Sequence, residues 1–216
     1  MFDQIFGFPI YITSIKSSLY NKKNIIDTIE RNYNKSPIRN HWDNTVYHGS
    51  EIHHSIWDQD NPNFENPNYS ILLPIYNKKI QKYLNELGVI KNTRYNFEII
   101  NYTCMTKGQS MRNHIHADCD FSGVHYVSFD EKTNDSTLFL NTQNHSKYLK
   151  HLREDSSILF DNKKTCNSYL YENFKFITKE DELIIFPSML EHSVPKVNSD
   201  KKRITIAFNV YLENVR

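Results

Sequence analysis

The chain has 216 residues, and 26 Lys+Arg against 25 Asp+Glu give a formal net charge of +1. This length is typical of one domain, and the balanced charge argues against a nucleic-acid partner, which usually needs a basic excess. The apolar runs are too short to cross a bilayer, and the first residues lack the pattern of a signal peptide. Three cysteines give no disulfide framework. We therefore expect a single cytoplasmic domain without a membrane or nucleic-acid partner, and nothing in the sequence indicates its oligomeric state.

Two helical patterns occupy the first part of the chain. Ile25, Ile29 and Tyr33 recur at helical spacing, and a stronger pattern runs from 73 to 87. Ser70 is the predicted N-cap of the second helix, and Gly88 its stop. Between the helices, residues 41–68 are polar and predict a long irregular connection.

After residue 92 the patterns become those of strands separated by turns. The predicted strands are Arg94–Met105, Ser122–Phe129, Ser136–Leu140, Tyr169–Ile177, Glu182–Phe186 and Arg203–Leu212. Strands that follow helices, rather than alternate with them, predict an α+β domain. Residues 1–91 would form a mainly helical part that packs on a sheet, and residues 92–216 the β core.

The last predicted strand has two unlike faces. Alternate residues from Ile204 to Leu212 are all apolar, so this face should pack on the helices. The other face carries Arg203, Thr205 and Asn209. Because buried polar groups need partners, this second face predicts an interior that holds a ligand.

Residues 113–118 concentrate side chains that bind metals. On an extended backbone His114, His116 and Asp118 would project from one side, and His192 follows the predicted strand Glu182–Phe186 after a short turn. Two histidines and one carboxylate on one face of an ion form the arrangement of non-haem Fe(II) oxygenases. Arg203 beside the hydroxyl of Thr205 suits a carboxylate ligand.

These motifs resemble those of the iron(II)/2-oxoglutarate-dependent dioxygenases. The superfamily's order of HxD, distal His and Arg-x-Ser/Thr is matched by His116-Ala117-Asp118, by His192 and by Arg203-Ile204-Thr205. Residues 113–127 and 182–209 are more closely similar to the prolyl-hydroxylase-like oxygenases predicted in marine bacteria and their phages. The resemblance covers roughly residues 94–212.

The resemblance implies a double-stranded β-helix, or jelly-roll, with the iron between two sheets. It implies that His116, Asp118 and His192 bind Fe(II) as the catalytic centre. Arg203 and Thr205 would hold the far carboxylate of the cosubstrate 2-oxoglutarate, and Tyr102 would donate a hydrogen bond to it. The implied reaction hydroxylates an unactivated C–H bond of an amino-acid, peptide or small-metabolite substrate while 2-oxoglutarate is decarboxylated to succinate. Ascorbate is an expected stimulant.

A second set of metal ligands fits the same segment. Related sequences often carry HxH without an acid at the position of Asp118, and prolyl-hydroxylase-like members place a glycine six residues before the ligand histidine. Counted from Gly108, that spacing selects His114. We favour His116 with Asp118, because a carboxylate balances the charge of Fe(II). The alternative pair is His114 with His116, with Asp118 beside them.

Two other functions compete with the oxygenase. A cupin-like module that binds a metal or a sugar without redox chemistry would not need Arg203 and Thr205. A halogenase of the same fold would need an open position where Asp118 stands. The substrate is not indicated by any motif, and residues 41–68 and 142–164 are the segments expected to cover the mouth of the site.

Overall fold

The computed structural model describes residues 7–36, 52–55, 61–89, 93–141 and 173–213. Within these residues, no helix combines the length and the apolar character that crossing a membrane would require. The helices are the short 3-10 helix η1 (Ser17–Leu19), α1 (Lys22–Lys35) and α2 (Leu72–Glu86). The strands are β1 (Tyr11–Ser14), β2 (His53–His54), β3 (Arg94–Met105), β4 (Met111–His114), β5 (Phe121–Ser128), β6 (Leu138–Leu140), β7 (Asn173–Lys175), β8 (Glu182–Pro187), β9 (His192–Val194) and β10 (Arg203–Glu213).

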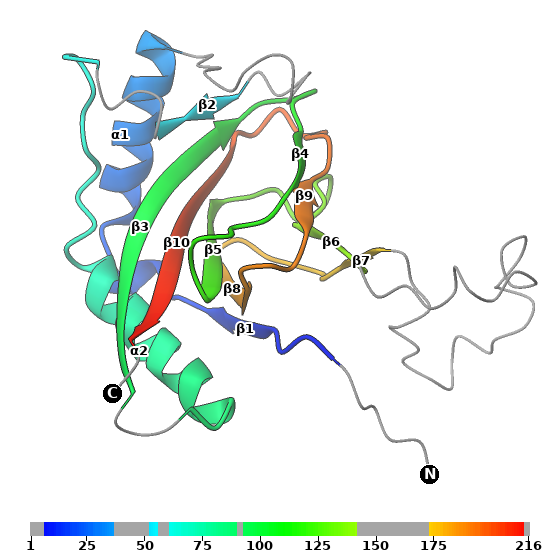
Figure 1. Ribbon diagram of the computed structural model, residues 1–216. Helices are drawn as coiled ribbons and strands as arrows, with labels where there is room; N and C mark the ends of the chain where they lie inside the picture. Colours follow the sequence, from blue (N-terminus) through cyan, green and yellow to red (C-terminus); the bar gives the residue numbers. More distant parts are fainter. Residues whose placement is uncertain (1–6, 37–51, 56–60, 90–92, 142–172, 214–216) are drawn as a thin grey trace, which may run out of the picture.

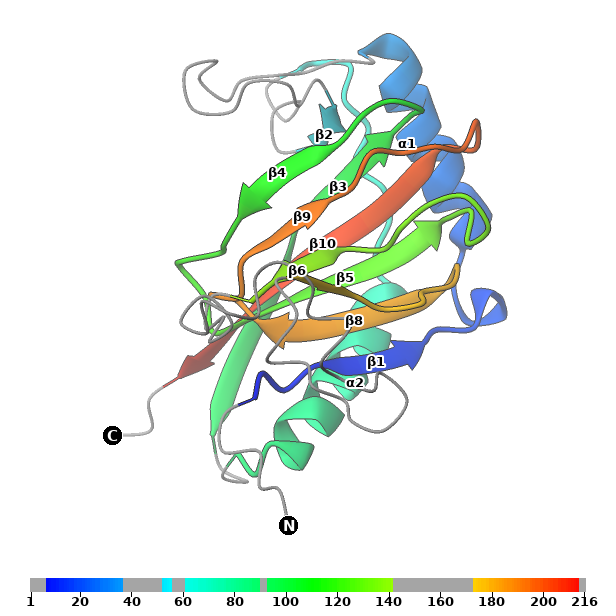
Figure 2. The same ribbon diagram turned by 90° about the vertical axis from the view of Figure 1, so that its right-hand side faces the viewer.

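The strands form two antiparallel sheets. The larger sheet has the order β1-β8-β5-β10-β3-β2, and the smaller sheet has the order β4-β9-β6-β7. Figure 1 shows α1 and α2 on one side of the larger sheet and the smaller sheet on the other. In the turned view the smaller sheet lies in front and both helices lie behind (Figure 2). The larger sheet therefore has one face toward the helices and one toward the smaller sheet.

Strand β10 has the two faces predicted from its sequence. Ile204, Ile206 and Phe208 are fully buried in a cluster with apolar residues of α1 and α2. Arg203 and Thr205 point to the opposite face, because successive residues of a strand alternate. The central strand thus delivers polar side chains into the space between the sheets.

Both predicted helices are confirmed. Helix α1 buries Ile25 and Ile29, and α2 buries Tyr76 and Ile80 among other residues. Gly88 follows α2 with a φ of 76°, the left-handed conformation that favours glycine at a helix end.

The predicted N-cap of α2 is wrong. Ile71 occupies that position, and the backbone N–H of Ser70 donates to Asn68 Oδ1 at 3.0 Å instead. The turn made by the Asn68 side chain therefore delays the start of the helix until Leu72.

The long strands lie where the sequence predicted them, and the short strands β6 and β7 lie within the predicted ranges Ser136–Leu140 and Tyr169–Ile177. Four other short strands were not predicted. Strand β3 has the predicted bounds, and β5, β8 and β10 differ by one or two residues. Strands β1, β2, β4 and β9 span only two to four residues each, too few to show an alternating pattern. Strand β2 lies inside the connection 41–68, of which only 52–55 and 61–68 are described. The segment 142–164 lies outside the described residues.

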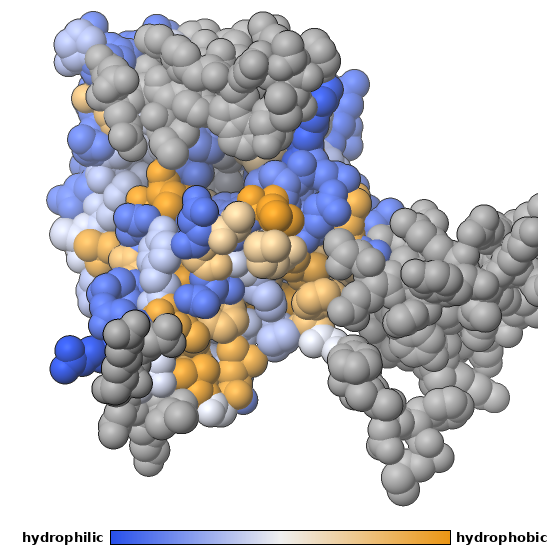
Figure 3. Space-filling model, in the orientation of Figure 1, coloured by the Kyte–Doolittle hydropathy of each residue, from blue (hydrophilic) through white to orange (hydrophobic). Residues whose placement is uncertain are grey.

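Two apolar clusters lie between the sheets. One joins Tyr126 of β5 and Phe186 of β8 to Phe139 of β6, and the other joins Met105 of β3 to Val194 of β9. On the outer surface, apolar side chains are mixed with hydrophilic ones (Figure 3). Because folded domains ordinarily expose such mixtures, the surface alone does not mark a functional site. The buried polar side chains between the two sheets, which include His192 and Arg203, do mark one.

Candidate metal centre and anion pocket

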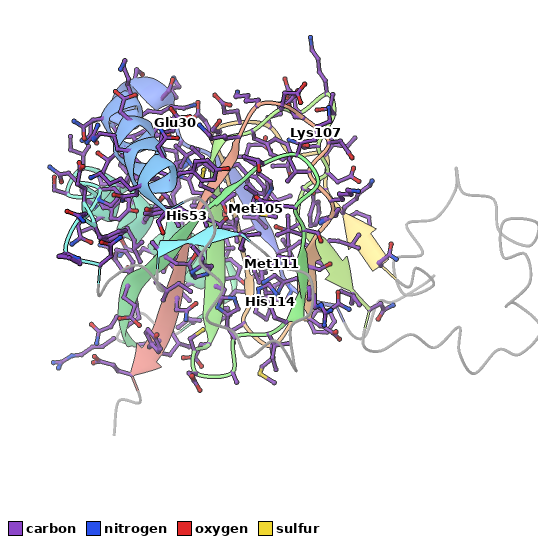
Figure 4. The ribbon with its side chains drawn as sticks, turned by 90° about the horizontal axis from the view of Figure 1, so that it is seen from above. Glu30, His53, Met105, Lys107, Met111 and His114 are labelled. Carbon is purple, nitrogen blue, oxygen red and sulfur yellow. The ribbon has the colours of Figure 1, made fainter. Side chains whose placement is uncertain are left out.

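Three histidines converge between the sheets. His114 ends β4, His116 lies in the loop after it, and His192 begins β9. One ring nitrogen from each lies within 4.8 Å of the other two. His114 and His192 are register partners of the antiparallel pair β4–β9, and their ring centroids are 4.2 Å apart. Figure 4 shows His114 beside Met111 on β4, across from Met105 of β3. The sheet pairing itself thus brings the histidines together.

Hydrogen bonds fix which nitrogen of each ring faces this common point. His114 Nδ1 lies 2.8 Å from the carbonyl oxygen of Arg112, and His192 Nδ1 lies 2.8 Å from that of Leu190. His116 Nδ1 lies 3.0 Å from Asn209 Oδ1. Because these oxygens only accept, each Nδ1 must carry the hydrogen. Each Nε2 therefore keeps its lone pair for a metal, in the arrangement that metal-binding histidines usually show.

The three rings are held neutral. Burial lowers the pKa of His114 and of His116, in the latter case aided by the neighbouring His114. Burial, and then the charge of His114, lowers the pKa of His192 to about 3. Neutral imidazole is the form that binds a metal, so these rings can accept an ion at neutral pH without first releasing protons.

Asp118 is not part of this cluster. The strand β4 ends at His114, and the chain turns at 117–118, which leaves the Asp118 side chain exposed. Three backbone hydrogen bonds hold the turn: His116 N–H to Ser188 O, Ser188 N–H to Asp120 O, and Asp120 N–H to Val210 O, each 3.0 Å long. The extended backbone assumed for 114–118 is therefore wrong after His116, and Asp118 does not share a face with the two histidines.

Arg203 is a buried cation with unsatisfied donors. Its side chain is 1% exposed, and its Nε and Nη2 have no hydrogen-bond partner among the described residues. Nη1 lies 4.0 Å from Met105 Sδ, and the Tyr126 ring lies 5.2 Å from the guanidinium carbon. Burial lowers the pKa of Arg203. An uncompensated buried charge is unfavourable, so the pocket is suited to a carboxylate that would pair with it.

Thr205 and Tyr126 lie next to Arg203 on the inner face. Thr205 Oγ1 is 2.8 Å from Thr103 Oγ1, and Thr205 pairs with Tyr126 in the β10–β5 register. The Tyr126 hydroxyl is 2.7 Å from Thr137 Oγ1 and accepts from the Thr137 N–H at 2.9 Å. Tyr126 was not predicted to be a site residue. It lies four residues after Ser122 on β5, so the two side chains point to the same face of the sheet, and the strand pattern could have assigned Tyr126 to this face.

His54 of β2 also belongs to this face and was missed as a site residue. It pairs with Thr103 in the β2–β3 register and is 6% exposed. Burial, and then the charge of His114, lowers its pKa to about 3. A strand of two residues has no pattern, so no signal in the sequence could have placed His54 here.

Tyr102 does not reach the pocket. It pairs with Ile206 of β10, on the face that packs against the helices. Its hydroxyl accepts from Asn32 Nδ2 at 2.9 Å and lies 3.0 Å from His53 Nε2. These contacts tie β2, β3 and α1 together on the side opposite Arg203, so we propose no contact between Tyr102 and a cosubstrate.

The residues present fit an iron ion and a dicarboxylate. Imidazole nitrogens are suitable ligands for Fe(II), and three of them on one side leave other positions of the ion open. The unsatisfied guanidinium of Arg203 lies between the same two sheets and matches a carboxylate in charge and in hydrogen bonding. Together the two features offer ligands for a metal and a partner for a carboxylate in the space between the two sheets.

The comparisons with known proteins agree with this chemistry. No curated protein matches the chain in sequence. In structure it is similar to a Pseudomonas putida prolyl-4-hydroxylase, with a TM-score of 0.53 and 11% identity over 96% of this chain and 94% of that one. It is also similar to a prolyl hydroxylase from Trichoplax adhaerens, with a TM-score of 0.53 and 12% identity over 94% of this chain and 83% of that one. At such low identity these similarities show the fold alone.

The sequence match is more specific. Residues 101–209 match the family described as "Putative 2OG-Fe(II) oxygenase", a stretch that covers half of the chain and includes the three histidines and Arg203. The chain belongs to this family of dioxygenases, whose metal is Fe(II) and whose cosubstrate is 2-oxoglutarate.

Proposed function

We propose that the protein is an Fe(II)- and 2-oxoglutarate-dependent hydroxylase. Its substrate would be an amino acid, a peptide or a small metabolite with an unactivated C–H bond, and 2-oxoglutarate would be decarboxylated to succinate. The observation that carries this proposal is the pairing of three inward-facing histidines with the unsatisfied, buried Arg203 in one space between two sheets.

We further propose that β3 to β10 form a double-stranded β-helix. From β3 to β10 the chain alternates between the larger sheet (β8-β5-β10-β3) and the smaller one (β4-β9-β6-β7), except that the consecutive strands β6 and β7 pair within the smaller sheet, and this winding is that of a jelly-roll. Residues 1–91 would cover the outer face of the larger sheet and complete a single domain. The burial of α1 and α2 side chains against β10 supports this arrangement.

The metal ligands in this proposal are His114, His116 and His192. His116 and His192 belong to both sets predicted from the sequence, and the geometry favours His114 over Asp118 as the third ligand. His114 lies opposite His192 in the sheet register, while Asp118 lies beyond the turn.

Each of the other residues has a role set by its contacts. Arg203, with the Thr205 hydroxyl beside it, would bind and orient the far carboxylate of 2-oxoglutarate. Asn209 holds the His116 ring by accepting from its Nδ1–H, and Ser122 Oγ donates to the same oxygen at 3.1 Å. The apolar clusters around Phe186 and Met105 would exclude water from the space between them. Bound Fe(II) and 2-oxoglutarate would supply the oxidising chemistry.

In this proposal, the parts of the chain around this pocket determine which substrate binds. One of the structural relatives described above, the Trichoplax enzyme, is a prolyl hydroxylase in complex with a peptide fragment. A peptide substrate is therefore within our proposal, beside free amino acids and small metabolites. Mass spectrometry of a lysate treated with the enzyme, in search of products heavier by one oxygen atom, would identify the class.

The proposal is tested by cosubstrate binding. Purified protein loaded anaerobically with Fe(II) should develop a weak visible charge-transfer band when 2-oxoglutarate is added, and should release succinate once oxygen is admitted. Arg203→Ala should weaken 2-oxoglutarate binding by about 2–5 kcal/mol, because one partner of a buried charge pair is removed. Arg203→Lys should recover part of this loss, since it restores a point charge without the fork.

The controls distinguish a loss of metal binding from a loss of 2-oxoglutarate binding. EDTA should abolish both the band and succinate release, and Fe(II) with ascorbate should restore them. Arg203→Ala should still bind the metal, because Arg203 is not a ligand. A parent protein that shows no band at saturating Fe(II) and 2-oxoglutarate would refute the proposal, and equal cosubstrate affinity in parent and Arg203→Ala would refute the role of Arg203.

A further inference from the structure

The interior around the three histidines contains no carboxylate. Among the described residues, no aspartate or glutamate is buried, and the buried set includes only one permanently charged side chain, Arg203. Asp118 and Asp120, which follow His116, are exposed, and Glu191, which precedes His192, is half-buried; none of the three offers an oxygen to the histidine cluster. The charge of this pocket is therefore positive before any metal enters it.

The hydrogen bonds behind the histidines add no negative charge either. Their Nδ1–H groups donate to the carbonyl oxygens of Arg112 and Leu190 and to the side-chain amide oxygen of Asn209. In many metal sites a carboxylate occupies this supporting position and raises the basicity of the ring. Here all three acceptors are neutral, as are all three ligands.

A divalent ion in this pocket would thus lack the compensation that a carboxylate ligand provides. It would carry its full double charge in the same space between the sheets as the buried guanidinium of Arg203, where charges are weakly screened. The missing negative charge must come from a bound anion. 2-Oxoglutarate is a dianion, and its two carboxylates match the two centres of positive charge.

We infer that the metal and 2-oxoglutarate bind this pocket as a strongly coupled pair, so that the metal content of the protein follows the concentration of 2-oxoglutarate. The inference rests on the proposed function, and deepens it by naming what regulates the loaded state. Coupling is reciprocal: whatever factor 2-oxoglutarate adds to metal affinity, the metal adds to the affinity for 2-oxoglutarate. Without the dianion, the three neutral imidazoles should hold the metal weakly.

The test measures metal affinity with and without the cosubstrate. Mn(II) serves as the probe, since the electron paramagnetic resonance signal of the free ion reports directly how much is unbound. In the parent protein, saturating 2-oxoglutarate should lower the Mn(II) dissociation constant about 100-fold, near the upper end of ordinary coupling between two sites. The 2-oxoglutarate dissociation constant, measured with and without Mn(II), should fall by the same factor.

Two matched variants separate the effect of ligand charge from the effect of chelation, because 2-oxoglutarate can chelate the metal in the parent and in both variants. His116→Asp places a carboxylate among the ligands and should bind Mn(II) more tightly alone, with a coupling of about tenfold or less. His116→Asn has nearly the same shape without the charge, so it should keep the large dependence on 2-oxoglutarate. Circular dichroism of both variants confirms that they fold.

Each result decides a different claim. A large factor in parent and His116→Asn with a small one in His116→Asp supports the inference. Equal factors in parent and His116→Asp, with both ligands bound, would overturn the inference and leave the oxygenase proposal standing. Failure of the parent protein to bind Mn(II) even with 2-oxoglutarate present would overturn both.

Discussion

At the scale of single residues, the proposed metal centre depends on which side chain joins His116 and His192 as the third ligand. The sequence favoured Asp118, because HxD is common and a carboxylate balances charge. That reasoning assumed an extended backbone through residue 118. The structure ends the strand at His114, because Ser188 and Val210, distant in sequence, accept and impose the hydrogen bonds of the following turn. Contacts of this kind cannot be derived from local spacing.

Two alanine substitutions distinguish the ligand sets. His114→Ala should weaken Mn(II) binding in the presence of 2-oxoglutarate by about 100-fold or more, since losing a ligand exceeds the 10–100-fold that follows loss of a supporting residue. Asp118→Ala should bind Mn(II) almost as the parent does, because its side chain is exposed and outside the cluster. The reverse pattern, with Asp118→Ala losing the metal and His114→Ala keeping it, would establish the HxD set.

At the scale of elements, the helices and long strands were predictable, and four of the six short strands were not. The alternation of β10 identified both its apolar face and the inward position of Arg203 and Thr205. By contrast, β4 and β9 hold two of the histidines in strands of four and three residues. Their pairing is set by the sheets around them. Tyr102 shows a related limit: both faces of β3 are buried near its end, so pattern could not assign the side chain to a face.

The packing of α2 on the larger sheet contains a buried titratable group. His125 of β5 is fully buried, and its Nδ1 lies 2.8 Å from the Tyr76 hydroxyl of α2. Burial, together with the charge of Lys22, lowers the pKa of His125 from 6.5 to about 3. Between these pH values the unfolded chain binds a proton that the folded chain does not. The contribution that neutral, buried His125 makes to the free energy of unfolding is therefore complete above pH 6.5 and is lost as the pH falls through this window.

Replacing His125 should flatten this dependence on pH. His125→Asn keeps a polar group near the Tyr76 hydroxyl but cannot titrate. In this variant the free energy of unfolding should still fall between pH 6 and pH 4. The slope of that fall should be smaller than the parent's slope by about 1.4 kcal/mol per pH unit. Urea unfolding in EDTA at several pH values measures both slopes. Parallel curves for the two proteins would show that His125 takes up no proton on unfolding.

At the scale of the whole molecule, the site joins the two sheets. His114 and His192 come from the smaller sheet, and Arg203 comes from the larger one. The helices secure the larger sheet from behind, through a core that includes Ile204 and Ile206. The smaller sheet has no such support among the described helices. It is attached through apolar clusters and through the loop after β4, where His116 is hydrogen-bonded to Asn209 of the larger sheet. A bound metal and dicarboxylate would therefore connect the two layers.

This arrangement predicts a large stabilisation by the ligands together. At concentrations about 100 times the dissociation constant, a ligand that binds only the folded state adds about 2.7 kcal/mol to the free energy of unfolding. For a chain of this size, that corresponds to a rise of roughly 5–10 °C in the thermal midpoint. Mn(II) with 2-oxoglutarate should produce such a rise in calorimetry, and either ligand alone a much smaller one. In His192→Ala the combined shift should nearly vanish, whatever the midpoint of the unliganded variant. A full shift in that variant would mean that the ligands bind elsewhere, because His192 is the ligand that we propose β9 of the smaller sheet contributes to the metal.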